Sequence, residues 1–356
     1  MPARRHRFLT GLFALLWLSA LSPVAVGEHI FYTLEQTEQH LRQIAPSPWV
    51  RPTPSARGFN HGGLGADGAG DLGRFIIGRT PGTEGGGYTW GPDELPVPAQ
   101  SIYAFHLSDF ETEGDKVRVI IVGGQHADEQ HSLHALEGMV DFLLGDDPRA
   151  AALRRRAEFF IYPQVNPEGN WAPGAGKSSG IAQQPEQPRL DMNRFWHEPD
   201  TAHAPWDRPF ANIQIVRGAM KVDTAPADAA GEGAAEKAGD DGEAGEVGYL
   251  FDFHTPGPTR RGQPFIYVTR RDRDSAFGRA VLEDGTFTLR TSAGHRGMLR
   301  IWSKTPAEGC GLGVQHGFTP EITRQDDDEP DTYRALGATL AHALHAALVE
   351  QMGEGE

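Results

Sequence analysis

The residues best suited to chemistry lie in the sequence Gly123-Gly124-Gln125-His126-Ala127-Asp128-Glu129. It follows an apolar run, Val117 to Val122, that is continuous enough to predict a strand buried on both faces. Open α/β sheets place their sites where such strands end. A histidine and a glutamate three residues apart at this turn can direct an imidazole nitrogen and a carboxylate oxygen to one point. The segment therefore indicates a metal site.

A third ligand has to come from elsewhere in the chain, because catalytic zinc takes three protein ligands and keeps one position for water. His254 is the candidate, since it ends the predicted strand Tyr249 to Phe253. Taken alone, the His-x-x-Glu pattern of His126 and Glu129 also suits a surface histidine. The assignment therefore depends on the other motifs of the chain.

Four further motifs follow in order: Asn166-Pro167-Glu168-Gly169, Asp191-Met192-Asn193-Arg194, Phe253-His254 and Phe318-Thr319-Pro320-Glu321. With residues 123–129 they resemble the zinc carboxypeptidase family of the pancreatic type. The resemblance begins at Phe31-Tyr32-Thr33-Leu34-Glu35 and Ile77-Gly78-Arg79-Thr80 and covers nearly the whole mature chain. It implies a single α/β domain with a mostly parallel or mixed central sheet and helices on both faces. It also implies a zinc metallopeptidase that cleaves an amide or peptide bond next to a free carboxylate.

The resemblance gives roles to seven residues of this chain. His126, Glu129 and His254 match the ligands of one zinc ion, and Glu321 matches the general base that activates zinc-bound water. Asp191 matches the carboxylate that holds the imidazole of His126 and makes it more basic. Asn193 and Arg194 match the pair that binds the terminal carboxylate of the substrate, a task that suits the planar guanidinium group.

The sequence departs from the family pattern in two places. An arginine that stabilises the oxyanion is expected between the second and third motifs, where Lys177 and Arg189 stand. Arg189 is preferred, because a guanidinium can donate two hydrogen bonds to the developing negative charge. No tyrosine lies between Val268 and Thr332 to close over the substrate, and Trp302 and His295 are the candidate substitutes.

Two other functions stay open at this point. An N-acyl amino acid deacylase similar to aspartoacylase and succinylglutamate desuccinylase would share the ligand pattern and have an arginine placed as Arg189 is. Its substrate would be an acyl amino acid in place of a peptide. A binding protein that kept the scaffold without catalysis is the third reading, although such proteins usually lack a ligand or the glutamate. The sequence leaves the preferred side chain open, with Arg300 and Lys304 in the region that often lines the specificity pocket.

The spacing of apolar residues predicts most of the framework. Strands are expected at Ser101 to Leu107, Phe159 to Tyr162 and Phe265 to Val268, and helices at Phe31 to Ala45, Leu133 to Leu144, Pro148 to Arg156 and Tyr333 to Met352. Thr33 is placed as an N-cap and Gly145 as a helix stop. The alternation of strands and helices favours a sheet with helices on both faces.

The first residues predict export to the periplasm or the medium. Arg4, Arg5 and Arg7 precede an apolar run from Phe8 to Val26, and Gly27 provides a small residue before Glu28. This order is typical of a secretory signal peptide at residues 1–27, followed by the catalytic domain at 28–356. A membrane anchor is the alternative, although the run is short and contains Ser22-Pro23.

Charge and composition limit the partners. Cleavage would remove three arginines and no acidic residue, so the formal charge would fall from −15 to −18. An acidic surface disfavours nucleic acid and anionic lipid as partners. Residues 225–248, which are mainly Ala, Gly, Glu and Asp, predict a flexible acidic insertion. Cys310 is the only cysteine, so the chain can form no internal disulfide.

Overall fold

The computed structural model describes residues 33–58, 70–80, 82, 89–90, 95–96, 98–126, 129–171, 192–194, 196, 211–225, 247–257, 260–292, 298–305, 311–351 and 353. The chain divides into two units, Met1–Phe31 and Tyr32–Glu356, and all of the described residues belong to the second. The predicted signal peptide therefore lies outside the described residues. So does the predicted acidic insertion, apart from residues 225, 247 and 248.

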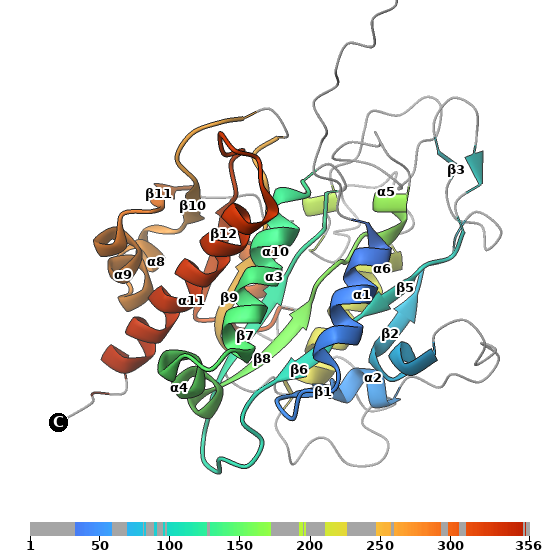
Figure 1. The fold of residues 1–356 in the computed structure, drawn as a ribbon, viewed down its shortest axis with the longest axis horizontal. Helices are drawn as coiled ribbons and strands as arrows, with labels where there is room; N and C mark the ends of the chain where they lie inside the picture. The colour runs from blue at the N-terminus through green and yellow to red at the C-terminus, as the bar shows by residue number, and fades with distance from the viewer. Residues whose placement is uncertain are drawn as a thin grey trace, which may run out of the picture. The chain divides into compact units, whose positions relative to one another are not determined.

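A mixed eight-stranded sheet forms the centre of the second unit, with the strand order β1-β6-β8-β7-β9-β12-β10-β11 (Figure 1). The strands are β1 (Val50–Pro52), β6 (Phe105–Leu107), β7 (Val117–Val122), β8 (Ala157–Tyr162), β9 (Val247–Asp252), β10 (Phe265–Val268), β11 (Thr288–Thr291) and β12 (His316–Glu321). The four middle strands β8, β7, β9 and β12 are parallel to one another. The predicted fold class is confirmed.

One predicted strand, Ser101 to Leu107, is in fact two strands in different sheets. β5 (Ser101–Tyr103) pairs with β2 (Ile76–Arg79), whereas β6 joins the central sheet. The chain changes partner at Ala104, whose backbone N–H donates to the carbonyl oxygen of Phe75. A second small sheet pairs β3 (Thr89–Trp90) with β4 (Leu95–Pro96).

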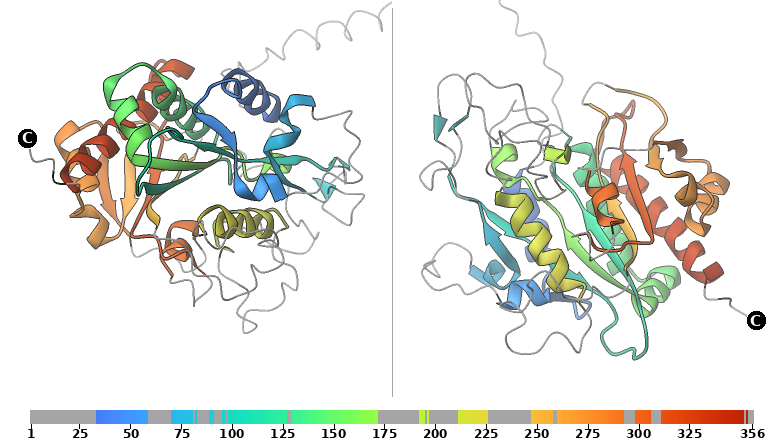
Figure 2. Two further views of the ribbon diagram at one scale, coloured as in Figure 1. Left: turned by 90° about the horizontal axis from the view of Figure 1, so that it is seen from below. Right: turned by 180° about the vertical axis from the view of Figure 1, so that it is seen from behind.

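Helices lie on both faces of the central sheet (Figure 2). α3 (His131–Leu144) and α11 (Pro330–Gln351) lie on one face, and α6 (Ala211–Asp223) and α10 (Leu299–Ser303) lie on the other. The remaining helices are α1 (Leu34–Ile44), α2 (Pro54–Gly58), η1 (Gly70–Phe75), α4 (Pro148–Arg156), α5 (Pro167–Trp171), η2 (Met192–Arg194), α8 (Arg270–Arg273) and α9 (Ala276–Asp284). Side chains of β7 from Val119 to Val122 have no exposed surface, as expected for a strand covered on both sides.

Local signals set several helix ends. Thr33 caps α1 with its side chain, while the side chain of Gln36 accepts a hydrogen bond from the backbone N–H of Thr33. α3 ends at Gly145, as predicted. α11 begins earlier than predicted, at Pro330, because proline is well tolerated in the first turn of a helix.

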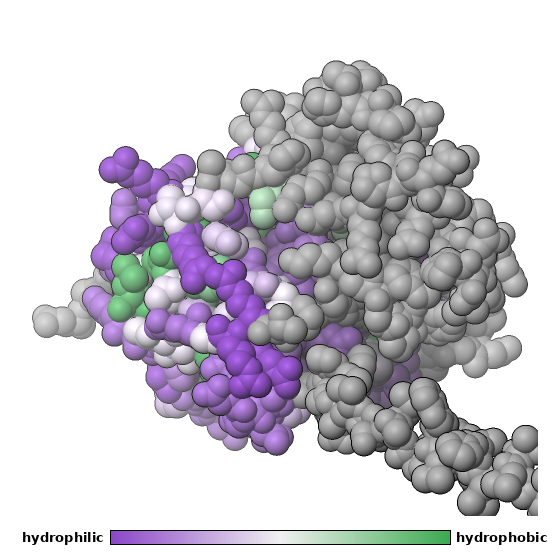
Figure 3. All heavy atoms as spheres, turned by 90° about the horizontal axis from the view of Figure 1, so that it is seen from above, coloured by the Kyte–Doolittle hydropathy of each residue, from purple (hydrophilic) through white to green (hydrophobic). Residues whose placement is uncertain are grey.

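Most hydrophobic side chains of the described residues are buried. Among them Leu282 is the one large hydrophobic residue that is strongly exposed, at 47%. The described surface in Figure 3 is accordingly mainly hydrophilic, with only small hydrophobic areas. Within the part of the chain that the structure describes, no helix combines the length and the apolar character that a membrane span requires.

Two glycines allow α3 and α11 to pack closely. A Cβ atom on Gly337 would lie 1.8 Å from the carbonyl oxygen of Ala135, and one on Gly138 would lie 2.1 Å from the carbonyl oxygen of Arg334. These contacts are with backbone atoms, which cannot turn away as a flexible side chain can. The separation of the two helices, and so the position of the start of α3, depends on both glycines.

We predict that Gly337→Val lowers the free energy of unfolding by about 1 to 3 kcal/mol or more, because the added atoms force the two helices apart. Gly218→Ala in α6 is the control, since a Cβ atom there meets nothing within 4 Å. It should leave stability unchanged or raise it, because alanine favours the helix more than glycine does. Urea denaturation of both variants measures the difference, and equal stabilities would contradict the packing argument.

Candidate metal centre and active site

The turn after β7 places His126 at the carboxyl end of the sheet. Backbone N–H groups of Val165 and Asn166 donate to the carbonyl oxygens of Gly123 and Gly124, each at 3.1 Å. Gly124 has a φ of +66°, which glycine adopts without strain. A Cβ atom on Gly123 would lie 2.9 Å from the carbonyl oxygen of Pro163. The two glycines are therefore required for the turn.

His254 follows β9 and is tied to both neighbouring strands. The N–H of Phe253 donates to the carbonyl oxygen of Val122 at 2.9 Å. His254 donates its own N–H to Pro320 at 2.8 Å and accepts from the N–H of Ile322 at 2.7 Å. These bonds fix His254 beside the end of β7 and opposite Glu321, with which it forms an isolated parallel bridge.

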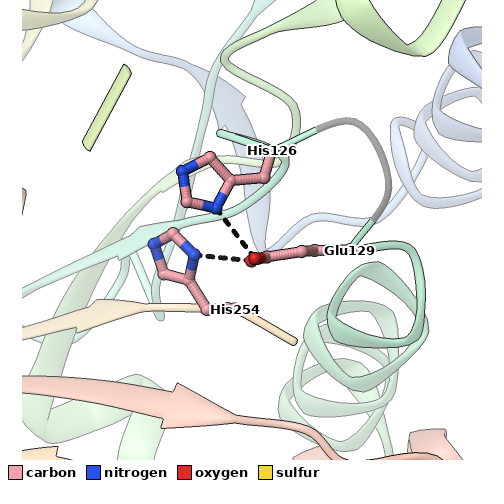
Figure 4. Close-up of side chains that lie close together, drawn as sticks. All are labelled: His126, Glu129 and His254. Carbon is pink, nitrogen blue, oxygen red and sulfur yellow. Dashed lines mark hydrogen bonds and ion pairs between the residues drawn. The ribbon is translucent and has the colours of Figure 1, made fainter. Parts of the chain in front are cut away.

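Three side chains converge at this edge of the sheet (Figure 4). Oε1 of Glu129 lies 2.9 Å from Nδ1 of His126, and Oε2 lies 2.6 Å from Nδ1 of His254. The backbone N–H of Thr255 donates to Oε2 at 3.0 Å. All three side chains are buried, with 5% of His126 and 3% each of Glu129 and His254 exposed. The predicted ligands are thus brought together through one nitrogen of each imidazole and one carboxylate.

The electrostatics of the three side chains favour an internal ion pair. Burial raises the pKa of Glu129, but the charges of His126 and His254 outweigh it and hold that pKa well below its usual range. Burial lowers the pKa of His254, but the charges of Asp252 and Glu129 outweigh it and hold that pKa well above its usual range. Without a metal, the carboxylate of Glu129 is therefore stabilised by charged imidazole, whose proton a metal ion would have to replace.

The donor set fits zinc. The three ligand atoms lie within 4.8 Å of one another. Ligands about 2.1 Å from a tetrahedral zinc ion are roughly 3.4 Å apart, which is compatible with that limit. Two imidazole nitrogens and one carboxylate are also a known ligand set of catalytic zinc, which leaves a position for water. His126, Glu129 and His254 are the residues that would hold the ion.

Three residues near His254 were not predicted as site residues. Asp252 Oδ1 lies 3.2 Å from Nε2 of His254 and accepts a hydrogen bond from Nε2 of Gln125. The indole N–H of Trp196 donates to Oε1 of Gln125 at 2.6 Å. Asp252 stands two residues before His254 in an extended segment, which was a usable signal. Nothing in the sequence pointed to Gln125 or Trp196.

The other predicted site residues are only partly described. Glu321 ends β12 next to His254 and is partly exposed. Asn193 lies in η2 and is 2% exposed, with its Nδ2 3.0 Å from Nε2 of His254. Arg189, Asp191 and the side chain of Arg194 lie outside the described residues, so their roles stay predictions.

Two residues considered for contact with the substrate, Trp302 and Lys304, make contacts with other residues of the protein instead. Trp302 is fully buried, with its ring centroid 5.9 Å from that of Trp196, so it cannot replace a tyrosine on a moving loop. Nζ of Lys304 lies 2.6 Å from Oδ1 of the buried Asp272, which makes Lys304 part of an internal ion pair. His295 lies outside the described residues.

The histidines on α3 contact residues of the surrounding fold and not the three candidate ligands. Nε2 of His131 lies 3.2 Å from Oδ1 of Asp328, and its ring packs against Tyr333. Nδ1 of His134 lies 3.6 Å from Oε2 of Glu137. Among the described residues, the group that could hold a metal ion is His126, Glu129 and His254.

Comparison with known proteins agrees with this geometry. Residues 97–213 match the family described as zinc carboxypeptidase. Cytosolic carboxypeptidase 6 of Mus musculus is 33% identical over 98 residues, which are 27% of this chain and 16% of the mouse protein. The match thus spans only about a sixth of that relative.

Solved structures share the fold at low sequence identity. A metallo-carboxypeptidase from Burkholderia cenocepacia has a TM-score of 0.55 and 17% identity, over 90% of this chain and 70% of that chain. The metallo-carboxypeptidase from Pseudomonas aeruginosa in complex with (2-guanidinoethylmercapto)succinic acid has a TM-score of 0.56 and 15% identity over the same shares. Residues 97–213 of this chain are therefore similar to the zinc carboxypeptidase family, and the chain shares its fold with solved metallo-carboxypeptidases.

Proposed function

We propose that this protein is a zinc-dependent metallocarboxypeptidase that cleaves the amide bond next to the free terminal carboxylate of a peptide. The observation that carries the proposal is the convergence of His126 Nδ1, His254 Nδ1 and the Glu129 carboxylate at the carboxyl ends of β7 and β9. The end of β12 brings Glu321 to the same edge.

Each residue has a distinct task in the proposed reaction. A zinc ion held by the three ligands would lower the pKa of bound water to about 7 and polarise the substrate carbonyl. Glu321 takes a proton from the attacking water and passes it to the leaving amine. Arg189 donates hydrogen bonds to the oxyanion.

Recognition of the substrate rests on the residues around η2. Arg194 and Asn193 bind the terminal carboxylate, which stays charged throughout the reaction. Among the cationic residues noted for the specificity pocket, Lys304 is held by Asp272. Arg300 is fully buried, and its Nε donates to Oγ1 of Thr319 at 3.2 Å.

We predict that the purified protein binds one zinc ion per chain and that His126→Ala or His254→Ala loses most of it, because two remaining protein ligands hold the ion too weakly. His131→Ala is the matched control, since this buried histidine of α3 contacts Asp328 and lies outside the three ligands. Elemental analysis measures the zinc. Full zinc occupancy in both ligand variants would show that His126 and His254 do not bind the ion.

For the general base, we predict that Glu321→Gln keeps zinc and substrate affinity but lowers kcat by about a hundredfold or more, since glutamine cannot take the proton. Single-turnover kinetics on a peptide with a free C-terminus measure the chemical step.

Peptides, N-acyl amino acids and muropeptides are compared as substrates of the wild type. If the protein hydrolysed acyl amino acids and no peptide, its function would be that of a deacylase and not that of a peptidase.

Arg194→Ala should instead raise KM, with a penalty of roughly 2 to 4 kcal/mol if its ion pair with the substrate is desolvated. The control is the same peptide with its terminal carboxylate amidated. It should be a poor substrate of the wild type and should lose little more in the variant. Equal wild-type rates on the free and the amidated peptide would rule out carboxylate recognition by Arg194.

A further inference from the structure

Two exposed arginines pack against one buried aromatic ring beside the proposed base. Cζ of Arg290 lies 3.6 Å from the centroid of the Phe265 ring, and Cζ of Arg260 lies 5.1 Å from it. Phe265 has no exposed surface, whereas both arginines are exposed. The ring attracts the two cations and so holds them in place. Packing on a ring uses the face of a guanidinium group, so its N–H donors stay available for a ligand.

The strand pairing places this ring next to Glu321. β10 lies between β12 and β11, and Phe265 is paired with Glu321 on one side and with Thr288 on the other. Side chains of directly paired residues project from the same face of a sheet. Since neighbouring strands lie about 4.8 Å apart, the two guanidinium groups lie roughly 10 Å from the backbone of Glu321.

Neither arginine has a carboxylate partner within the part of the chain that the structure describes. Composition does not explain this, because the chain has 48 acidic and 33 basic residues. The nearby carboxylates after Glu321 are paired with other arginines: Asp326 lies 3.2 Å from Arg261, and Asp328 pairs with Arg324. Two cations without carboxylate partners thus lie at the active-site edge of an acidic protein.

The proposed position of the substrate leads its chain towards these arginines. Asn193, assigned to the terminal carboxylate, lies beside His254 after the end of β9. In the strand order β9-β12-β10, Glu321 comes next and Phe265 follows it. A peptide whose C-terminus is bound on the β9 side of the base can therefore continue over β12 towards β10. At about 3.3 Å per residue, roughly 10 Å corresponds to three residues of extended chain.

We propose that Arg260 and Arg290 bind acidic side chains of the substrate, at positions about two to four residues upstream of the cleaved bond. The inference rests on the proposed function, because it assumes that a peptide is bound by its terminal carboxylate. Arginine suits the task, since its planar guanidinium group donates two hydrogen bonds to one carboxylate. The site would also offset the repulsion between an acidic peptide and a chain with a formal charge of −15.

Peptides that differ only at these upstream positions provide the test. One peptide carries glutamate there and the other glutamine, and both have the same C-terminal residue. The wild type should hydrolyse the glutamate peptide with a kcat/KM about three- to tenfold higher, since exposed ion pairs contribute modestly. This preference should shrink as the salt concentration is raised to about 1 M, because salt screens exposed charges.

Variants locate the preference. Arg260→Gln combined with Arg290→Gln should bring the ratio of the two kcat/KM values close to one. Replacement of both arginines by glutamate should invert the preference, so that a peptide with lysine at the upstream positions becomes the better substrate. The matched control is Arg270→Gln, which removes the same charge from an exposed residue beyond the other end of β10, where α8 begins. The control should keep the preference of the wild type.

The outcomes separate this site from the proposed function. If the wild type hydrolyses neither peptide, the proposed function is overturned. A wild type that cleaves both peptides at equal rates would overturn the acidic site alone.

The site would equally be overturned by a double glutamine variant that keeps the preference together with the zinc content and melting temperature of the wild type. Loss of the preference in the control as well would assign it to the overall charge of the protein, and not to this site. If the double variant does not fold, the two single variants decide. Each should lose part of the preference, and an unchanged preference in both would contradict the proposal.

Discussion

The parallel pairing of β7 with β9 and of β9 with β12 is the constraint on which the site depends. Parallel strands end at the same edge of a sheet, so segments more than a hundred residues apart in the chain reach one place. His126 follows β7, His254 follows β9, and Glu321 ends β12. A change in the order of these three strands would separate the ligands from one another and from the proposed base.

The same edge of the sheet carries several buried charged side chains that stabilise one another. Glu129 is 3% exposed, and such a carboxylate is costly to bury unless it is paired. It is paired with two imidazoles, and the second of these is paired with Asp252. Each charge is thus offset by the next, and a divalent cation would complete the set. Removal of one member leaves an uncompensated charge in the interior, which costs more than a surface pair would.

Backbone geometry and side-chain chemistry support each other at the turn after β7. The turn brings Gly123 and Gly124 against the segment from Pro163 to Asn166, and the amide of Asn166 donates to the carbonyl oxygen of Gln125 at 3.0 Å. The motif Asn166-Pro167-Glu168-Gly169 thereby has a structural task. Glu168 reaches further, since its carboxylate accepts from the N–H of Gly82 at 2.9 Å. Residues that the sequence grouped as motifs of a family therefore also hold together the loops of the site.

The sequence by itself predicted the three candidate ligands, the strands that precede two of them and the mixed α/β architecture. The strands could be predicted because their apolar pattern is local and strong, whereas the choice of His126, Glu129 and His254 depended on the ordered motifs that resemble the zinc carboxypeptidase family. The tertiary structure alone decided which nitrogen of each imidazole faces Glu129, and which groups surround the other nitrogen of His254. It also decided that Trp302 is buried, that Lys304 is paired with Asp272 and that Ser101 to Leu107 is divided between two sheets. These features depend on contacts between distant segments, such as Gln125 with Asp252 or Leu299 with Asn193, and no periodicity within one segment encodes them.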